Sequence, residues 1–242
     1  METIIKTHNL VYYTLLMLCS GAVFSVKAQP IDADFSIVAP RIVENETSFK
    51  IVVMEIDSLE RPIVPGVAGT VTLKAFIANS SGDTDTVSIT PSSFSVSGTG
   101  SDEFEITLGA VTNGTAIYIK AQGYGLPSFG DHSSGNIIVN DSANFGNLTT
   151  GVEISVPFSA NPNEPFPIFL TPVQRVENQQ QPGHPTSFND QVRLGTDTGS
   201  IEPEFVDINV VAGGSQLVYV TLDGVNANIE ITVASTDDSL EV

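Results

Sequence analysis

Apolar and polar residues alternate at a period of two along most of this chain. In the segment 69–78, for example, Val71, Leu73 and Ala75 share one side, with polar residues between them. Alternation over about four to eight residues, bounded by turn-forming residues, is typical of half-buried antiparallel strands. The expected strands are 34–39, 48–57, 69–78, 86–89, 93–97, 103–108, 115–121 and 136–139, followed by 152–158, 167–170, 191–194, 205–211, 216–222 and 228–234.

Helices have no comparable signal. The chain has 242 residues, of which 20 are Gly and 14 are Pro, and these residues interrupt it at short intervals. Its length after the N-terminal segment suits two domains of about 100 residues each. We therefore expect an all-β fold of two tandem immunoglobulin-like β-sandwich domains, one at 29–145 and a second, divergent one at 146–242. The junction falls in the polar, turn-rich sequence DSANFGNLTT.

The N-terminus has the layout of a secretory signal peptide, which we assign to residues 1–28. A short polar start with Lys6 precedes an apolar stretch at 11–26, and small Ala28 ends a plausible cleavage site. An uncleaved membrane anchor is the alternative, but the stretch falls short of the roughly 20 apolar residues that a bilayer requires. A lipoprotein signal is a weaker alternative, because Leu18 rather than a small residue precedes Cys19.

Composition narrows the class of protein further. The single cysteine, Cys19, lies inside the signal, so cleavage leaves a chain that disulfides cannot stabilise. The formal net charge is −19, and an acidic surface repels phosphate groups. We therefore exclude nucleic acid and anionic membranes as partners, and we expect no membrane span after signal cleavage. These observations favour a secreted, extracellular or cell-surface protein, with the periplasm as an open alternative.

The two halves read as distant copies of one unit. The segments SFKIVVMEID, GTVTLKA, DEFEITL and GTAIYIKAQG are answered in order by PFPIFLTPVQ, QVRLGTDTG, SQLVYVTLDG and NANIEITVAS. The segment APRIVENETSFKIVVMEIDSLERPIVPGVAGTVTLKA resembles the opening of the bacterial immunoglobulin-like repeats of surface and adhesin proteins, as does the later Gly-Thr motif in NGTAIYIKA. The resemblance covers about 100 residues and implies a sandwich fold in an adhesive or structural protein. The second half departs from it, because it lacks a Gly-Thr-Val strand.

Prolines are concentrated at the start of the second half. Half of the chain's 14 prolines fall between Pro157 and Pro185. Because proline donates no backbone hydrogen bond, this stretch is expected to form edge strand, loop or both. We expect the part from Pro172 to Pro185 to be one exposed loop.

Catalytic chemistry has little support. His132 and His184 lie in loops rich in Gly, Pro and Ser, and the adjacency of Asp131, His132 and Ser133 is not the geometry of a catalytic triad. We expect no enzymatic activity and no catalytic residue. A hydrolase that uses His132 is the least favoured alternative.

Calcium is the one cofactor for which the sequence offers candidate ligands. Asp83 with Asp85, and Asp237 with Asp238, supply paired carboxylates in short turns, and hard cations prefer such oxygen ligands. The alternative is that Asp, Ser and Gly simply make good turns. We expect no required cofactor and name these four residues as the candidate metal ligands.

Aromatic residues give one candidate contact for a sugar ligand. Tyr124 and Phe129, in QGYGLPSFG, form the one exposed-looking aromatic loop, whereas Tyr118 and Tyr219 lie inside alternating strands and are expected to be core or sheet-face residues. The sequence thus predicts a secreted, non-enzymatic structural or adhesion module of the bacterial envelope or exterior, with a protein or glycan partner. The alternative is a carbohydrate- or calcium-dependent binding module accessory to an enzyme. The oligomeric state is left open.

Overall fold

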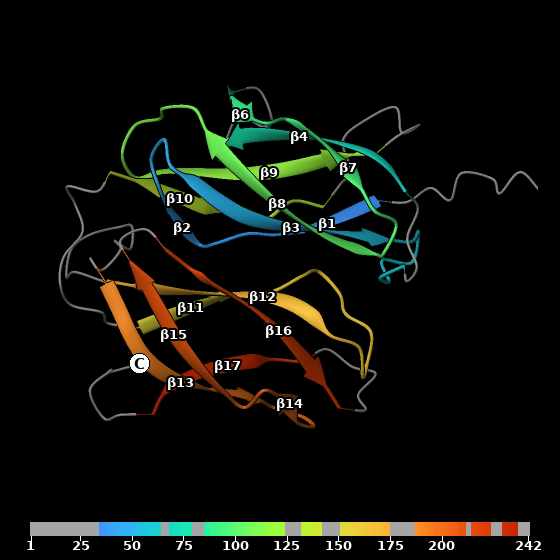
Figure 1. Ribbon diagram of the computed structural model, residues 1–242, viewed down its shortest axis with the longest axis vertical. Helices are drawn as coiled ribbons and strands as arrows, with labels where there is room; N and C mark the ends of the chain where they lie inside the picture. The colour runs from blue at the N-terminus through green and yellow to red at the C-terminus, as the bar shows by residue number, and fades with distance from the viewer. Residues whose placement is uncertain are drawn as a thin grey trace, which may run out of the picture. The chain divides into compact units, whose positions relative to one another are not determined.

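The fold is all-β. The computed structural model describes residues 34–63, 68–78, 85–123, 132–141, 151–174, 187–211, 214–223 and 229–236, and the expected signal lies outside them. These ranges contain strands and turns but no helix, and therefore no helix that is long and apolar enough to cross a membrane. They all belong to one compact unit, Asp32–Val242. Figure 1 shows β1–β10 in blue to olive and β11–β17 in yellow to red.

The first half comprises β1–β10, arranged in two sheets. One sheet has the order β1-β3-β8-β6, formed by Asp34–Val38, Ser48–Ile56, Ser101–Leu108 and Ile89–Thr90. The other has the order β2-β10-β9-β4-β5, formed by Ile42–Glu44, Ile137–Asn140, Thr115–Gln122, Gly69–Ile77 and Thr86–Val87, and β7 (Ser93–Val96) also pairs with β4. Every pairing is antiparallel except that of β2 with β10.

The second half comprises β11–β17. One sheet has the order β11-β12-β16-β14, formed by Gly151–Ser155, Phe166–Val173, Gln216–Leu222 and Ile201–Glu202. The other has the order β15-β13-β17, formed by Phe205–Val211, Ser187–Thr196 and Ile231–Ser235. The described part of the second half therefore builds its second sheet from fewer strands than the first half does.

The halves share a strand order. The repeat inferred from the sequence relates β3 to β12, β4 to β13, β8 to β16 and β9 to β17, and each pair holds the same place in its half. A further shared element is the sequence Ser-Ile-X-Pro, which ends in Pro91 and in Pro203, each after a cis peptide bond. In both halves the short strand before this proline pairs with one sheet and the strand after it pairs with the other.

Alternation explains the core of the first half. In β4, Val71, Leu73 and Ala75 are buried while Thr72 and Lys74 are exposed. The buried side chains of both sheets form one cluster, in which Phe104 stacks on Phe94 with ring centroids 4.3 Å apart. Removal of this apolar surface from water stabilises the half at roughly 25 cal/mol per Å² buried.

A second cluster joins the two halves. Val38 of β1, with Val52 and Met54 of β3, belongs to the cluster that otherwise consists of second-half residues such as Phe169 and Ile168. Val52 and Met54 lie on the face of β3 opposite to Ile51 and Val53, which belong to the first-half core. A strand with both faces covered is buried throughout, and β12 is buried at all eight positions. The sheets that contain β3 and β12 therefore pack against each other.

Hydrogen bonds cross the same interface. The backbone N–H of Arg41 donates to Oγ1 of Thr171 at 3.2 Å, and Nε of Arg41 donates to Oε2 of Glu153 at 3.0 Å. The N–H of Phe158 donates to Oγ of Ser36 at 3.0 Å, and both Ser36 and Thr171 are buried. These contacts satisfy polar groups that the interface would otherwise leave without partners.

Thr171 provides a test of this interface. We expect Thr171→Val to lower the free energy of unfolding by about 1–3 kcal/mol, because valine keeps the volume but leaves the Arg41 N–H without an acceptor. Urea denaturation measures the change. Thr72→Val, at an exposed position of β4, is the control and should change stability by less than about 0.5 kcal/mol. Equal stability of the two variants would contradict a hydrogen-bonded interface.

Two of the prolines contradict the expectation of edge strand or exposed loop. Pro167 and Pro172 lie in β12, an interior strand, and Pro172 is buried rather than part of an exposed loop. The register explains how the sheet accommodates them. Pro167 is paired with β16 only, and Pro172 is paired with β11 only, because the two neighbours are staggered along β12. Each proline thus has a paired neighbour on one side only. Residues 175–186 of the expected loop lie outside the described ranges.

Candidate functional site

Most of the site residues expected from the sequence lie outside the described ranges. These are Tyr124, Phe129, Asp83, Asp237 and Asp238, so the aromatic loop and the calcium pairs remain predictions. Asp85 is described: it is exposed, and its carbonyl accepts a hydrogen bond from the N–H of Ile77 at 2.9 Å. In the described part of the chain, no three His, Cys, Asp or Glu side chains gather as a metal site would require.

His132 lies beside acidic side chains. Its Nε2 is 3.8 Å from Oδ2 of Asp34 and 3.7 Å from Oε1 of Glu60, and its ring lies 4.4 Å from that of Phe158. These residues belong to the start of β1, the turn after β3 and the segment after β11. His132 therefore contacts residues of both halves. The expected absence of enzymatic activity stays a prediction.

Three hollows lined by residues that the structure describes are candidate sites. One, of about 330 Å³, is lined by 156–162 with Phe166, Leu222 and the start of β17. Another, of about 660 Å³, is lined by 86–88 and 109–112 with Ile77 and Thr115. Neither contains a charged side chain. The third, of about 590 Å³, combines charged side chains with an exposed aromatic ring, which suits recognition of a polar ligand.

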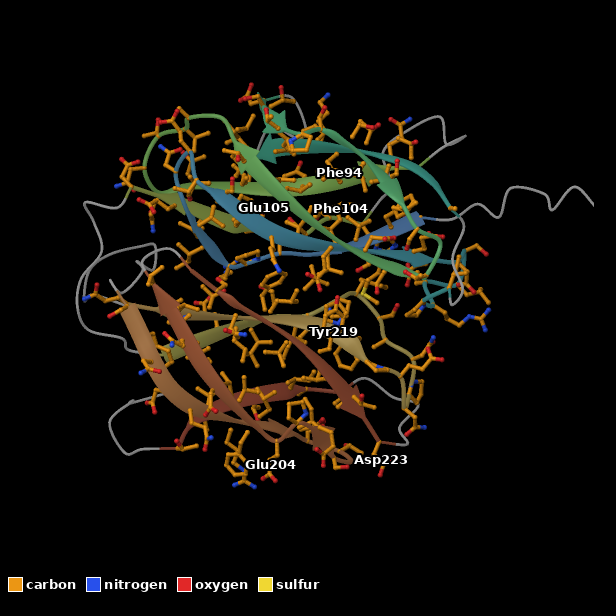
Figure 2. The ribbon with its side chains drawn as sticks, in the orientation of Figure 1. Phe94, Phe104, Glu105, Glu204, Tyr219 and Asp223 are labelled. Carbon is orange, nitrogen blue, oxygen red and sulfur yellow. The ribbon has the colours of Figure 1, made fainter. Side chains whose placement is uncertain are left out.

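We call this third hollow the Tyr219 groove. Its walls come from both halves: Lys50, Glu103 and Glu105 from β3 and β8, and Gln216, Leu217 and Tyr219 from β16. Figure 2 labels Glu105 and Tyr219 on the strands that border it. The sheet packing described above thus creates the groove, because neither half contains all of these residues.

Alternation in β16 turns Tyr219 toward the groove. Val220 and Leu222 are buried in the cluster that joins the two halves, so Tyr219 lies on the opposite face of the strand. Of its surface, 41% is exposed. Its Oη donates to Oε1 of Glu103 at 3.0 Å, and Nζ of Lys50 donates to the other oxygen of Glu103 at 3.4 Å. The carboxylate of Glu103 therefore accepts hydrogen bonds from both the hydroxyl of Tyr219 and the ammonium group of Lys50.

The surroundings of Tyr219 keep its phenol neutral. Partial burial, followed by the hydrogen bond and charge of Glu103 and the charge of Asp102, raises the pKa of Tyr219 to about 12. Since this pKa lies above the usual value of about 10, the neutral phenol contributes stability that is complete below about pH 10. That contribution is lost as pH rises toward 12.

An alkaline titration tests this arrangement. We expect tyrosinate absorbance to show a late step near pH 12 that Tyr219→Phe abolishes, while the steps nearer the ordinary tyrosine pKa remain. Circular dichroism at each pH serves as the control for unfolding. A titration curve that is unchanged in the variant would show that the hydrogen bond to Glu103 does not form.

Tyr219 was not named as a site residue from the sequence. The expectation placed it in the core or on a sheet face, and the structure shows it half-exposed on a sheet face. The alternation of Val218, Val220 and Leu222 is the signal that places Tyr219 on the outer face. No such signal exists for Lys50, Glu103 and Glu105, because their approach to Tyr219 depends on how the two halves pack.

Comparisons with known proteins add little. No family model and no curated protein match the chain. Among solved structures, one similar chain is Escherichia coli alpha-2-macroglobulin activated by porcine elastase, with 10% sequence identity and a TM-score of 0.32. The match covers 88% of this chain and 21% of that chain, so this chain spans about a fifth of the macroglobulin's length. A similarity of this size assigns neither a family nor a function.

Proposed function

We propose that this chain is a secreted, non-enzymatic structural or adhesion module of the bacterial cell envelope or exterior. It consists of two tandem immunoglobulin-like sandwich domains that act as one rigid spacer. The interface between the halves carries this proposal. Val38, Val52 and Met54 are at most 5% exposed because second-half residues cover them, and a large apolar interface opposes hinge motion between domains.

The strand order supports the immunoglobulin-like assignment. In that fold one sheet contains the first, second, fifth and fourth strands, and the other contains the third, sixth and seventh. If the short strands β2, β5 and β7 are set aside, the seven remaining strands of the first half follow this order. One sheet then has β1-β3-β8-β6 and the other has β10-β9-β4. The chain passes from β1 to β2, and so from one sheet to the other, at Pro40.

Charge limits the class of partner. The net charge of −19 disfavours nucleic acid as a partner, because phosphate groups carry the same sign. Mixed-sign contacts such as Arg193 with Glu204, at 2.8 Å, are exposed and contribute little to stability. Calcium remains an expectation from the sequence, and the partner that we propose is a protein or glycan at the cell exterior.

Deletion of the gene in the source organism tests this function. We expect the protein in the surface or secreted fraction, and we expect the deletion to lower attachment to solid substrata by several fold. Wild-type protein should restore attachment. Recovery of the protein from the cytosol, or a deletion strain with unaltered attachment and envelope integrity, would contradict the proposal.

A further inference from the structure

We propose that the Tyr219 groove is a binding site for a neutral oligosaccharide, with the Tyr219 ring as the platform for one sugar ring. This inference rests on the proposed function, because it places the glycan partner in the groove, but its failure would leave the rigid spacer unaffected, since a spacer needs no groove. The groove volume of about 590 Å³ lies within the range of roughly 300–1,000 Å³ that is usual for small-ligand sites.

The ring of Tyr219 is prepared for stacking. It lies on the outer face of β16 with 41% of its surface exposed, and the hydrogen bond of its hydroxyl to Glu103 at 3.0 Å restrains its orientation. A restrained ring loses little side-chain entropy when a ligand binds. The negative π-face of an aromatic ring attracts the weakly positive C–H groups that a pyranose presents on one side.

Polar side chains surround this platform. Glu105 and Gln216 line the same groove, and together they offer carboxylate and amide groups that accept from and donate to hydroxyl groups. Ser48 and Ser215 add hydroxyl groups at its walls. An aromatic face with hydrogen-bonding groups around it matches a sugar, whose ring has apolar C–H groups and whose periphery has hydroxyls.

The charge of the groove disfavours an anionic ligand. Lys50 is the one cation among the residues that line the groove, and Glu103 and Glu105 outnumber it, so the groove disfavours a uronic acid. Lys50 also offsets the charge of Glu103, which leaves a net charge of about −1 from Glu105 in the groove. The aromatic platform and the hydroxyl and amide groups around it favour a neutral saccharide over a basic peptide.

Calorimetric titration of the purified chain with cellohexaose, chitohexaose and mannohexaose tests the proposal. We expect at least one of them to bind, and we expect Tyr219→Ala to weaken that binding by about tenfold. Tyr219→Phe keeps the ring and should stay within about threefold of the wild type. Phe205→Ala removes a ring that is 49% exposed on β15, away from the groove, and should leave binding unchanged.

Three results would overturn the proposal. The first is no binding of any of these hexasaccharides at millimolar concentration, and the second is binding that Tyr219→Ala leaves intact. The third is salt-sensitive binding of octalysine, abolished by Glu105→Gln, without any saccharide binding, which would assign the groove to a basic peptide. Gln216→Ala provides an independent variant of the groove if Tyr219→Ala fails to fold, and it should also weaken saccharide binding.

Discussion

Replacement of Val52 by Asp should lower the free energy of unfolding by about 3–5 kcal/mol, because it buries an unpaired carboxylate between the halves. Val52 is 0% exposed in the structure, and it lies on the outer face of its sheet, which only the second half covers. We expect Val52→Asp to separate a single urea transition into two, since each half retains its own core. Circular dichroism suits this measurement, because the chain has no Trp that could report unfolding by fluorescence.

Thr72→Asp is the matched control for Val52→Asp. Thr72 lies on the outer face of the other sheet of the first half, where it is exposed to solvent. A new charge there should change stability by less than about 0.5 kcal/mol. If Val52→Asp were as harmless as Thr72→Asp, Val52 would have to face solvent, and the packing between the halves would be refuted.

Truncation of Phe169 to Ala should cost about 3–5 kcal/mol of stability, because it leaves a cavity where a large side chain is 1% exposed. Phe169 belongs to the cluster that joins the halves, and it also lines the Tyr219 groove. The same variant should therefore weaken the packing beneath the groove. Urea denaturation gives the first effect, and the accessibility of introduced cysteines along the groove gives the second.

Phe205→Ala is the control for Phe169→Ala. Phe205 is an aromatic residue of the same half, 49% exposed at the start of β15, and its truncation leaves no cavity. We expect a change of less than about 1 kcal/mol. A cost for Phe169→Ala that is no greater than this would place Phe169 at the surface rather than between the halves.

Local pattern was sufficient to predict most strands. The segments 205–211 and 216–222 were expected as strands and are β15 and β16, because polar residues alternate there with Val206, Ile208, Val220 and Leu222. The three-residue strand β2 was missed, since three residues are too few to show alternation and its parallel partner, β10, is distant in sequence.

The packing between the halves was harder to predict. IVVM in β3 and FPIFL in β12 are continuous apolar runs, and such runs are consistent with strands that are buried on both faces. They show that a second face is covered but not what covers it. The Tyr219 groove depends on that packing, so neither its carboxylates nor Tyr219 was named as a site residue, although the alternation in β16 is consistent with Tyr219 on a sheet face.

The most direct test of the rigid unit is the distance between nitroxide labels at Thr72→Cys and Asp207→Cys, measured by pulsed electron paramagnetic resonance. Both positions are exposed, one in each half, and the one native cysteine, Cys19, lies in the expected signal. We expect one narrow distance distribution, which Val52→Asp broadens. A broad distribution in the otherwise unaltered chain would mean that the halves move independently, and would contradict the proposal of a single rigid module.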